Sequence, residues 1–216
     1  MNICIPVLNR YDLLDRLLES LLESEVVPTK VCVIDNGSNF SIKKEFARLN
    51  IETYRPQQNI GVAKSWNWFI KNVPEIRLIT NDDVVFYPNT IGELIKAYKD
   101  NYLIFPNGMA GDISSFSCFM LSDKIVKDVG YFDEDISPNY AYFEDNDYHR
   151  RMLAKGYDIK QAKNAFVGHF ISATLARYSV GELAQHHDKF RLARKNYTKK
   201  WGGLPGKETF FTPFNK

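Results

Sequence analysis

The strongest constraint on the fold is a regular alternation of strand-like and helix-like segments over the first 80 residues. Short apolar runs are each followed by a stretch whose apolar residues recur at three- and four-residue spacing. We expect strands at 3–8, 31–34, 51–55 and 77–80, and helices at 11–24, 41–49 and 62–72. A strand–helix–strand order of this kind predicts a mostly parallel sheet with helices on both faces.

The second half of the chain is less regular. It predicts helices at 90–99, 123–129, 144–155 and 180–201, and strands at 118–121 and 165–167. A passage rich in Gly and Ser lies between them at 107–117. Because no repeat, low-complexity tract or linker interrupts the chain, we expect residues 1–216 to form one α/β domain.

Polar residues follow three of the predicted strands at the points where those strands end. They are Asn9-Arg10, Asp35-Asn36 and Asn81-Asp82-Asp83. Ligands of parallel sheets bind beyond the carboxyl ends of the strands, so these groups are expected to line one crevice. Adjacent carboxylates such as Asp82 and Asp83 repel unless a cation neutralises them, and Mg²⁺ or Mn²⁺ prefers such oxygen ligands. The alternative is an exposed turn that caps the next helix.

A second acidic cluster, Glu144-Asp145-Asn146-Asp147, opens a predicted helix. Acidic residues are favourable at a helix start, and Asp147 can also pair with Arg151 four residues later. Three acids in four residues nevertheless exceed what one cap needs, and a carboxylate in a cleft can act as a general base. His169, which follows a strand and a glycine, can bind a metal or a diphosphate, or be structural.

Composition and charge narrow the function classes. Residues 1–148 carry 14 Lys and Arg against 22 Asp and Glu, whereas residues 149–216 carry 14 against 4. The basic part suits phosphates, or an anionic membrane that carries a lipid-linked acceptor, or is a solvated helix face. A nucleic-acid binder is not expected, because no recognition motif accompanies the charge.

The absence of several motifs argues against other enzyme classes. The chain has no Gly-x-Ser-x-Gly, Walker-type loop or GxGxxG, which argues against a serine hydrolase, a P-loop enzyme or a dinucleotide enzyme. Three cysteines without metal spacing, and no apolar run near the ~20 residues of a membrane span, predict a cytoplasmic protein.

Taken in order, these segments resemble glycosyltransferase family 2, which has the GT-A fold. The motifs are IPVLNR (5–10), VIDNGS (33–38), NIGVAKSWN (59–67), ITNDDVVF (79–86), GYFDED (130–135), YFEDNDYHRRM (142–152) and GHF (168–170, with Ser172 close by). The match runs from IPVLNR to KKWGG. It departs from the family's DxD motif at the first position, which is Asn81.

The resemblance implies a nucleotide-sugar-binding half at about 1–100 and an acceptor half at about 101–216. The donor would be a UDP-, dTDP- or GDP-sugar held with Mn²⁺ or Mg²⁺, and the acceptor a glycan. The implied donor contacts are Pro6, Val7, Asn9, Arg10, Asp35 (to the base), Asn59, Gly61, Lys64, Asn81 and Asp82. The implied metal ligands are Asp83 and His169, and Arg150, Arg151 and Ser117 would contact the diphosphate or the acceptor.

The resemblance further implies that Asp145 is the catalytic base, with Glu144 as the second choice. One base acting in an in-line displacement inverts the anomeric centre. Two alternatives remain at this point. One is a module that binds nucleotide-sugars without turnover. The other is a sugar-nucleotide pyrophosphorylase, which normally carries a Gly-rich basic loop where this chain has Asn9-Arg10-Tyr11-Asp12.

Overall fold

Eight strands form one mixed sheet in the computed structural model, which describes residues 1–74, 76–109, 113–170 and 179–216. The strands are β1 (Asn2–Val7), β2 (Lys30–Asp35), β3 (Ile51–Tyr54), β4 (Arg77–Thr80), β5 (Val84–Phe86), β6 (Tyr102–Gly108), β7 (Cys118–Met120) and β8 (Asp158–His169). Their order across the sheet is β3-β2-β1-β4-β7-β6-β8-β5. Both halves of the chain therefore contribute to the same sheet.

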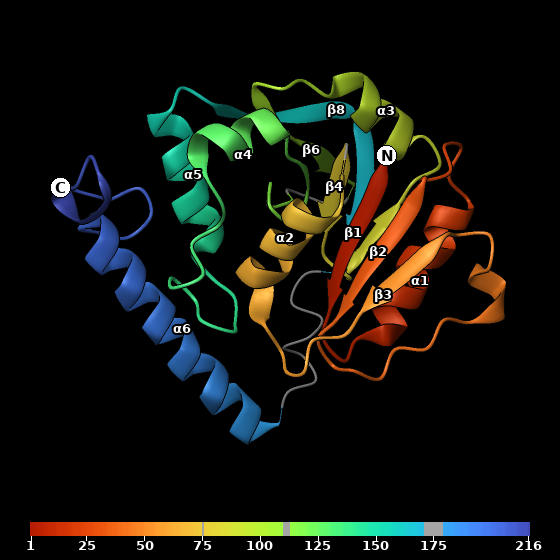
Figure 1. Ribbon diagram of the computed structural model, residues 1–216, viewed down its shortest axis with the longest axis horizontal. Helices are drawn as coiled ribbons and strands as arrows, with labels where there is room; N and C mark the ends of the chain where they lie inside the picture. Colours follow the sequence, from red (N-terminus) through yellow and green to blue (C-terminus); the bar gives the residue numbers. More distant parts are fainter. Residues whose placement is uncertain (75, 110–112, 171–178) are drawn as a thin grey trace.

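The first half confirms the predicted parallel sheet. Strands β3, β2, β1 and β4 are parallel neighbours. Alternate residues of β1 face opposite sides: Ile3 and Ile5 pack with helix α1 (Tyr11–Leu22), and Cys4 packs with helix α2 (Gly61–Asn72). Figure 1 shows these two helices on opposite faces of the sheet. The leucines at helical spacing in α1 are buried, as the periodicity predicts.

The second half adds antiparallel strands and the remaining helices. Strand β7 pairs antiparallel with β4 and β6, β8 pairs parallel with β6, and β5 pairs antiparallel with β8. The helices are α3 (Thr90–Ala97), α4 (Asp123–Val129), α5 (Glu144–Ala154) and α6 (Val180–Trp201), with 3-10 turns at Lys44–Phe46 and Pro213–Asn215. In Figure 1, α6 lies beyond α5, on the side of the molecule away from β3.

The predicted helix at 41–49 is wrong. Only the single 3-10 turn Lys44–Phe46 forms there. Phe46 and Leu49 are buried, but Ile42 is 46% exposed, so the apolar residues do not share one packed face. A segment this short does not hold a helix without such a face, because the first turn is costly to form.

The sequence pattern does not predict all strands of the second half, or their full length. No strand was expected at β5 or β6, and β8 is much longer than the expected 165–167. Strand β6 contains Pro106, and its pairing with β8 shifts register between Pro106 and Asn107. The first part of β8 is largely exposed and polar, so it lacks the apolar alternation that marks a strand.

Helices α5 and α6 are joined by buried charges that meet at Asp147, whose side chain is fully buried. Its carboxylate accepts hydrogen bonds from Arg151 Nε at 2.9 Å and Trp201 Nε1 at 2.9 Å, and Lys200 Nζ lies 2.6 Å away. Lys200 also contacts Asp133 at 2.6 Å. The predicted pair between Asp147 and Arg151 is thus confirmed, within a larger network that fixes the start of α5.

Replacing Asp147 by asparagine is expected to lower the free energy of unfolding by about 2 kcal/mol, because the buried Lys200 loses half of its neutralising charge. Denaturant unfolding at pH 7 measures this change. Asp188→Asn is the matched control: Asp188 pairs with Arg191 on the exposed side of α6, and its loss is expected to change stability by less than about 0.5 kcal/mol. Equal effects of the two variants would contradict the assigned role.

Candidate active site

The carboxyl ends of β1, β2 and β4 meet at one edge, as the sequence predicts. Asp35, the last residue of β2, is buried and organises the turn that follows it. Its carboxylate accepts hydrogen bonds from Tyr11 Oη at 2.7 Å and from the backbone N–H groups of residues 37, 38 and 40. Arg55 Nε also lies 3.3 Å from it. A nucleotide base that bonded this carboxylate would have to displace one of these donors, so the base contact stays a prediction.

The start of α2 is packed tightly against the loop around 139–140. Gly61 has φ +76°, and a Cβ there would lie 2.3 Å from the backbone nitrogen of Tyr140. Asn59 Oδ1 accepts from the backbone N–H of Gly61 at 2.8 Å, and Lys64 Nζ donates to Asn139 at 2.9 Å. The Asn59, Gly61 and Lys64 predicted as donor contacts therefore fix the loop next to the crevice.

Asn9 and Arg10 follow β1 at the same edge. Asn9 adopts φ 58°, and a Cβ on Gly37 would lie 2.1 Å from Asn9 Oδ1, so the two turns touch. Arg10 is 6% exposed and donates to Asp12 through Nε at 2.9 Å. The hydrogen bond to Asp12, with further attraction from Asp82 and Asp83, raises the pKa of Arg10. This cation therefore belongs to the acidic cluster after β4. Pro6 and Val7 precede it in β1.

Asp83 and His169 are brought together by the pairing of β5 with β8. The register places Val84 opposite His169, and the backbone N–H of Phe170 donates to the carbonyl of Asp83 at 2.9 Å. His169 Nε2 lies 3.2 Å from Asp83 Oδ1. That oxygen and His169 Nδ1 are both buried and have no hydrogen-bond partner among the described residues. Burial and the neighbouring charge of Asp83 raise the pKa of Asp82 to about 8, whereas Arg10 opposes this shift.

The carboxylate oxygen of Asp83 and the imidazole of His169 fit a divalent cation. An unpartnered carboxylate oxygen next to an imidazole is a donor set that Mn²⁺ or Mg²⁺ accepts, with phosphate oxygens and water completing the shell. Within the part of the chain that the structure describes, no three His, Cys, Asp or Glu side chains converge on one point. A cation at this place would therefore take two protein ligands at most from this part of the chain and depend on a bound ligand for the rest.

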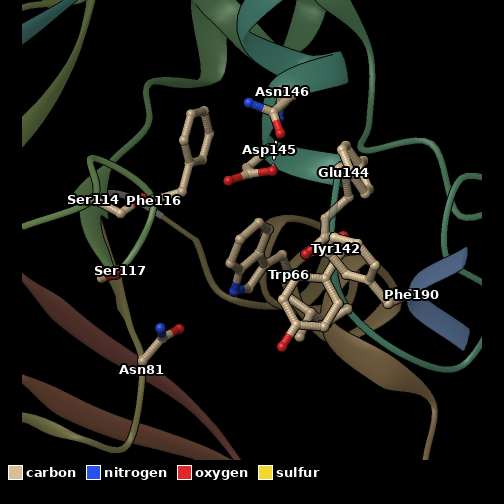
Figure 2. A pocket seen from close by; sticks show the side chains of 13 residues that line it. Trp66, Asn81, Ser114, Phe116, Ser117, Tyr142, Glu144, Asp145, Asn146 and Phe190 are labelled. Atoms are coloured by element: carbon tan, nitrogen blue, oxygen red, sulfur yellow. Dashed lines mark hydrogen bonds between the residues drawn. The ribbon is translucent and has the colours of Figure 1, made fainter. Parts of the chain in front are cut away.

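A pocket of about 320 Å³ opens between the end of β4 and the start of α5. Its polar walls are Asn81, Ser117, Glu144, Asp145 and Asn146, and its aromatic walls include Trp66, Phe116, Tyr142, Phe143 and Phe190. Figure 2 shows Asp145 across the pocket from Asn81 and Ser117, with Trp66 between them. Ser117 is linked to β4 through its carbonyl, which accepts from the backbone N–H of Asn81 at 2.8 Å.

The two carboxyl groups of the pocket lie in the first turn of α5. Glu144 is 4% exposed, and its Oε2 is buried with no hydrogen-bond partner in the described part of the chain. Burial, and then the charge of Asp145, raise the pKa of Glu144 to about 8; burial also raises the pKa of Asp145. The backbone before them is strained, because Tyr142 and Phe143 adopt φ 93° and 68°. Such strain on bulky residues is typical of functional sites, and here it directs the start of α5 into the pocket.

Comparison with known proteins assigns the family. The family model described as "Glycosyl transferase family 2" matches residues 2–215. The chain belongs to glycosyl transferase family 2. A search of curated protein sequences found no match.

Solved structures of similar fold are glycosyltransferases. Mannosyltransferase PcManGT from Pyrobaculum calidifontis, in complex with GDP-Man and Mn²⁺, aligns over 96% of this chain with a TM-score of 0.64 and 12% identity. GalNAc-T7 with UDP, GalNAc and Mn²⁺ aligns over 92% at 0.61 and 10%, and S. aureus TarS 1–349 with UDP-GlcNAc over 92% at 0.61 and 16%. These likenesses confirm the GT-A fold.

The family 2 chain is shorter than these proteins. It spans 66% of the length of the mannosyltransferase, 50% of GalNAc-T7 and 43% of the longer TarS structure. In TarS 1–349 with UDP-GlcNAc the covered share is 72%.

Arg150 and Arg151 lie outside this pocket, so their contact with a diphosphate or acceptor stays a prediction. Arg150 Nη2 donates to the carbonyl of Phe210 at 2.6 Å, and its guanidinium lies over the ring of Trp201. Arg151 donates to Asp147 and to the carbonyls of residues 129 and 131. Neither lines the pocket: Arg150 faces the C-terminal segment, and Arg151 faces the segment at 129–131. Ser172 of the predicted motif lies outside the described residues.

Sequence reasoning missed the aromatic walls of this family 2 pocket. Trp66, Tyr142 and Phe190 were not singled out, since aromatic residues at helical spacing usually belong to a core. The one available signal for Tyr142 was its position directly before the acidic cluster. Phe190 comes from α6, which only tertiary packing places beside α5.

The raised pKa of Glu144 predicts a pH-dependent stability. The folded protein keeps a proton on Glu144 that the unfolded chain releases above its ordinary value of 4.5, so the free energy of unfolding falls as pH rises from about 4.5 to 8. Glu144→Gln removes this pH-dependent loss of stability, which is roughly 4 kcal/mol at pH 8. Unfolding measured between pH 5 and 8.5 should give a flatter profile for the variant and higher stability at pH 8. Parallel profiles would contradict the buried, protonated state.

Proposed function

We propose that this chain is a metal-dependent, inverting glycosyltransferase that moves a sugar from a nucleoside-diphosphate-sugar to a hydroxyl group of a glycan. The observation that carries the proposal is the placement of the Asp145 carboxylate in a pocket opposite Asn81, next to the acidic end of β4. Membership of family 2 and the GT-A fold support it.

The residues divide the reaction between two sides of the pocket. The nucleotide would lie across the carboxyl ends of β1 and β2, where Asn9, Arg10 and the turn after Asp35 form the edge. Asp83 and His169 would hold the cation together with the diphosphate, with Asp82 beside them. When bound, the cation neutralises negative charge on the leaving diphosphate. Ser117 and Asn81 form the polar wall on this side.

Asp145 would act from the other side. Breaking the anomeric C–O bond builds positive charge on the sugar, and a carboxylate there accepts the proton of the attacking hydroxyl. The raised pKa of Asp145 makes it a stronger base than an ordinary aspartate. With a single base and an in-line attack, the configuration at the anomeric carbon inverts.

The donor proposals follow the ligands of the structural neighbours. Those structures contain GDP-Man, UDP and UDP-GlcNAc, so UDP- and GDP-sugars are the first donors to test here, and dTDP-sugars follow from the resemblance in sequence. Mn²⁺ occurs in two of them.

The cytoplasmic location and the membrane contact stay predictions. Within the described residues, no helix is long and apolar enough to cross a membrane. Helix α6 carries exposed basic residues: Lys189, Arg191, Arg194, Lys195 and Lys199. Such a face can meet anionic lipids at the membrane surface.

A thermal-shift screen tests the proposed function. Nucleoside diphosphates and their sugars would be added with and without Mn²⁺, and a ligand at 100 times its Kd is expected to stabilise the protein by about 2.7 kcal/mol. Stabilisation by at least one nucleotide-sugar that depends on Mn²⁺ supports the proposal. No shift with any nucleotide, or a shift indifferent to Mn²⁺, contradicts the metal-dependent donor site.

A further inference from the structure

Two deeply buried polar groups of residues that line the same pocket have no hydrogen-bond partner among the described residues. The indole Nε1 of Trp66 and Oε2 of Glu144 are both without a hydrogen bond. Trp66 is 3% exposed and Glu144 is 4% exposed, and both line the pocket at α5. Leaving such groups unsatisfied costs about 1–3 kcal/mol each, so a ligand that bonds them recovers that free energy.

The indole of Trp66 is held rigidly. The ring of Phe132 lies 4.9 Å from it and that of Phe119 5.2 Å away, both edge-on, and Phe116 stacks at 6.2 Å. The next residue, Asn67, fixes helix α2 by exchanging hydrogen bonds with the backbone of Phe132 at 2.9 Å. Trp66 thus carries a fixed N–H donor into the pocket, which is the arrangement a specificity-determining group needs.

The chemistry of the pocket selects the ligand class. An apolar ligand would leave both Trp66 and Glu144 unsatisfied. A phosphate or carboxylate would accept from Trp66 but lie close to the carboxylate of Asp145, which repels it. Hydroxyl groups both donate and accept, so a ring bearing several of them satisfies both sites. The faces of Tyr142 and Phe190 provide apolar walls for such a ring.

We propose that Trp66 determines specificity by donating its indole N–H to a hydroxyl of the pyranose ring in this pocket, while the carboxyl group of Glu144 bonds a second hydroxyl. This inference rests on the proposed sugar transfer and names the residue that reads the sugar. The pyranose can belong to the donor or to the acceptor, and the two sources share this chemistry.

The test compares Trp66→Phe with Trp68→Phe. Phenylalanine keeps an aromatic ring at position 66 but removes the N–H, and because Nε1 has no partner among the described residues, the variant loses no hydrogen bond there and is expected to fold. Trp68 is two residues along α2, where it stacks on Tyr54 outside this pocket, and it is the matched control. Thermal unfolding confirms that both variants are folded.

Affinities are measured by calorimetry in two arms with Mn²⁺ present. The first arm uses UDP-GlcNAc, UDP-glucose and GDP-mannose, each beside its nucleoside diphosphate. The second uses free methyl glycosides added to protein that holds the nucleoside diphosphate. If the pocket holds the donor sugar, the effect appears in the first arm; if it holds the acceptor sugar, it appears in the second. In that arm, Trp66→Phe is expected to weaken binding roughly 3- to 10-fold and Trp68→Phe to have no effect. Binding of the nucleoside diphosphate alone should be unchanged in both variants.

Deoxy analogues of the bound sugar give the second measurement. One deoxy position should lower affinity in the wild type and have no further effect in Trp66→Phe, because the lost hydroxyl and the lost N–H are the same contact. Equal affinity of wild type and Trp66→Phe in both arms, or additive losses for every deoxy analogue, would overturn the inference. A different result would contradict the proposed function itself: the wild type would then bind no nucleoside diphosphate and no nucleotide-sugar.

Discussion

Asp145→Asn is expected to lower the rate of sugar transfer by about 10²–10⁴-fold while leaving the affinity for the nucleotide-sugar within about 3-fold. Asparagine keeps the size of the side chain and the contact from the backbone N–H of Asn146, but it cannot accept the proton of the attacking hydroxyl. The variant should also be as stable as the wild type or more so, because burial disfavours the charge that is removed.

Single-turnover transfer and calorimetric binding of the donor measure the two quantities separately. Asp128→Asn makes the same chemical change on the exposed side of α4, where the carboxylate contacts Lys124 at 3.2 Å, and should leave transfer unchanged. A residual rate above about a tenth of the wild-type rate in Asp145→Asn would remove Asp145 from the role of base.

Asp83→Ala is expected to abolish stabilisation of the donor complex by Mn²⁺ and to reduce transfer by on the order of 10²-fold or more. The substitution removes the carboxylate oxygen that is buried without a hydrogen-bond partner beside His169. Because that oxygen accepts no hydrogen bond from the described residues and only approaches His169 Nε2 at 3.2 Å, the stability without Mn²⁺ should change little.

The affinity for Mn²⁺ in the presence of the nucleoside diphosphate can be followed through electron paramagnetic resonance of the free ion. Asp100→Ala, in the exposed turn before β6 at a distance from this edge, serves as the control. Unchanged Mn²⁺ affinity in Asp83→Ala would place the cation elsewhere. A weakened site in His169→Ala would identify the second ligand.

The first half of the fold was predictable because local pattern and tertiary packing agree there. The leucines of α1 repeat at helical spacing and face one side of β1, so periodicity alone locates both elements. The polar residues at the ends of β2 and β4 follow from the rule for parallel sheets. In 41–49 the same periodicity gave a wrong helix, since tertiary packing buries Phe46 and leaves Ile42 exposed.

The far edge of the sheet was less predictable. Strand β8 begins with Asp158 and is largely exposed in its first part, and only its pairing with β6 and β5 makes it a strand. That pairing also positions His169 next to Asp83. The resemblance proposed this neighbourhood, but the register that produces it lies in long-range contacts that a local pattern does not contain.

The site also contains residues that the sequence predicts and residues that only the tertiary structure reveals. Asn81, Ser117, Glu144 and Asp145 were expected from motifs and do line one pocket. Arg150 and Arg151 share their motif with Asp145 but face away from the pocket, towards Phe210 and the segment at 129–131, because a side chain's direction on a helix depends on its position around the axis. Trp66 was not predicted, because an aromatic residue at helical spacing usually belongs to the core. Its N–H, which has no partner among the described residues, is what distinguishes it from a core residue.

The most direct test of the central claim is the anomeric configuration of the product, determined by NMR after incubation with an α-linked nucleotide-sugar, Mn²⁺ and a panel of glycan acceptors. Wild-type protein is expected to form a β-linked product and release the nucleoside diphosphate, and Asp145→Asn to form almost none. An α-linked product, or equal product formation by Asp145→Asn, would contradict transfer by a single base at the start of α5.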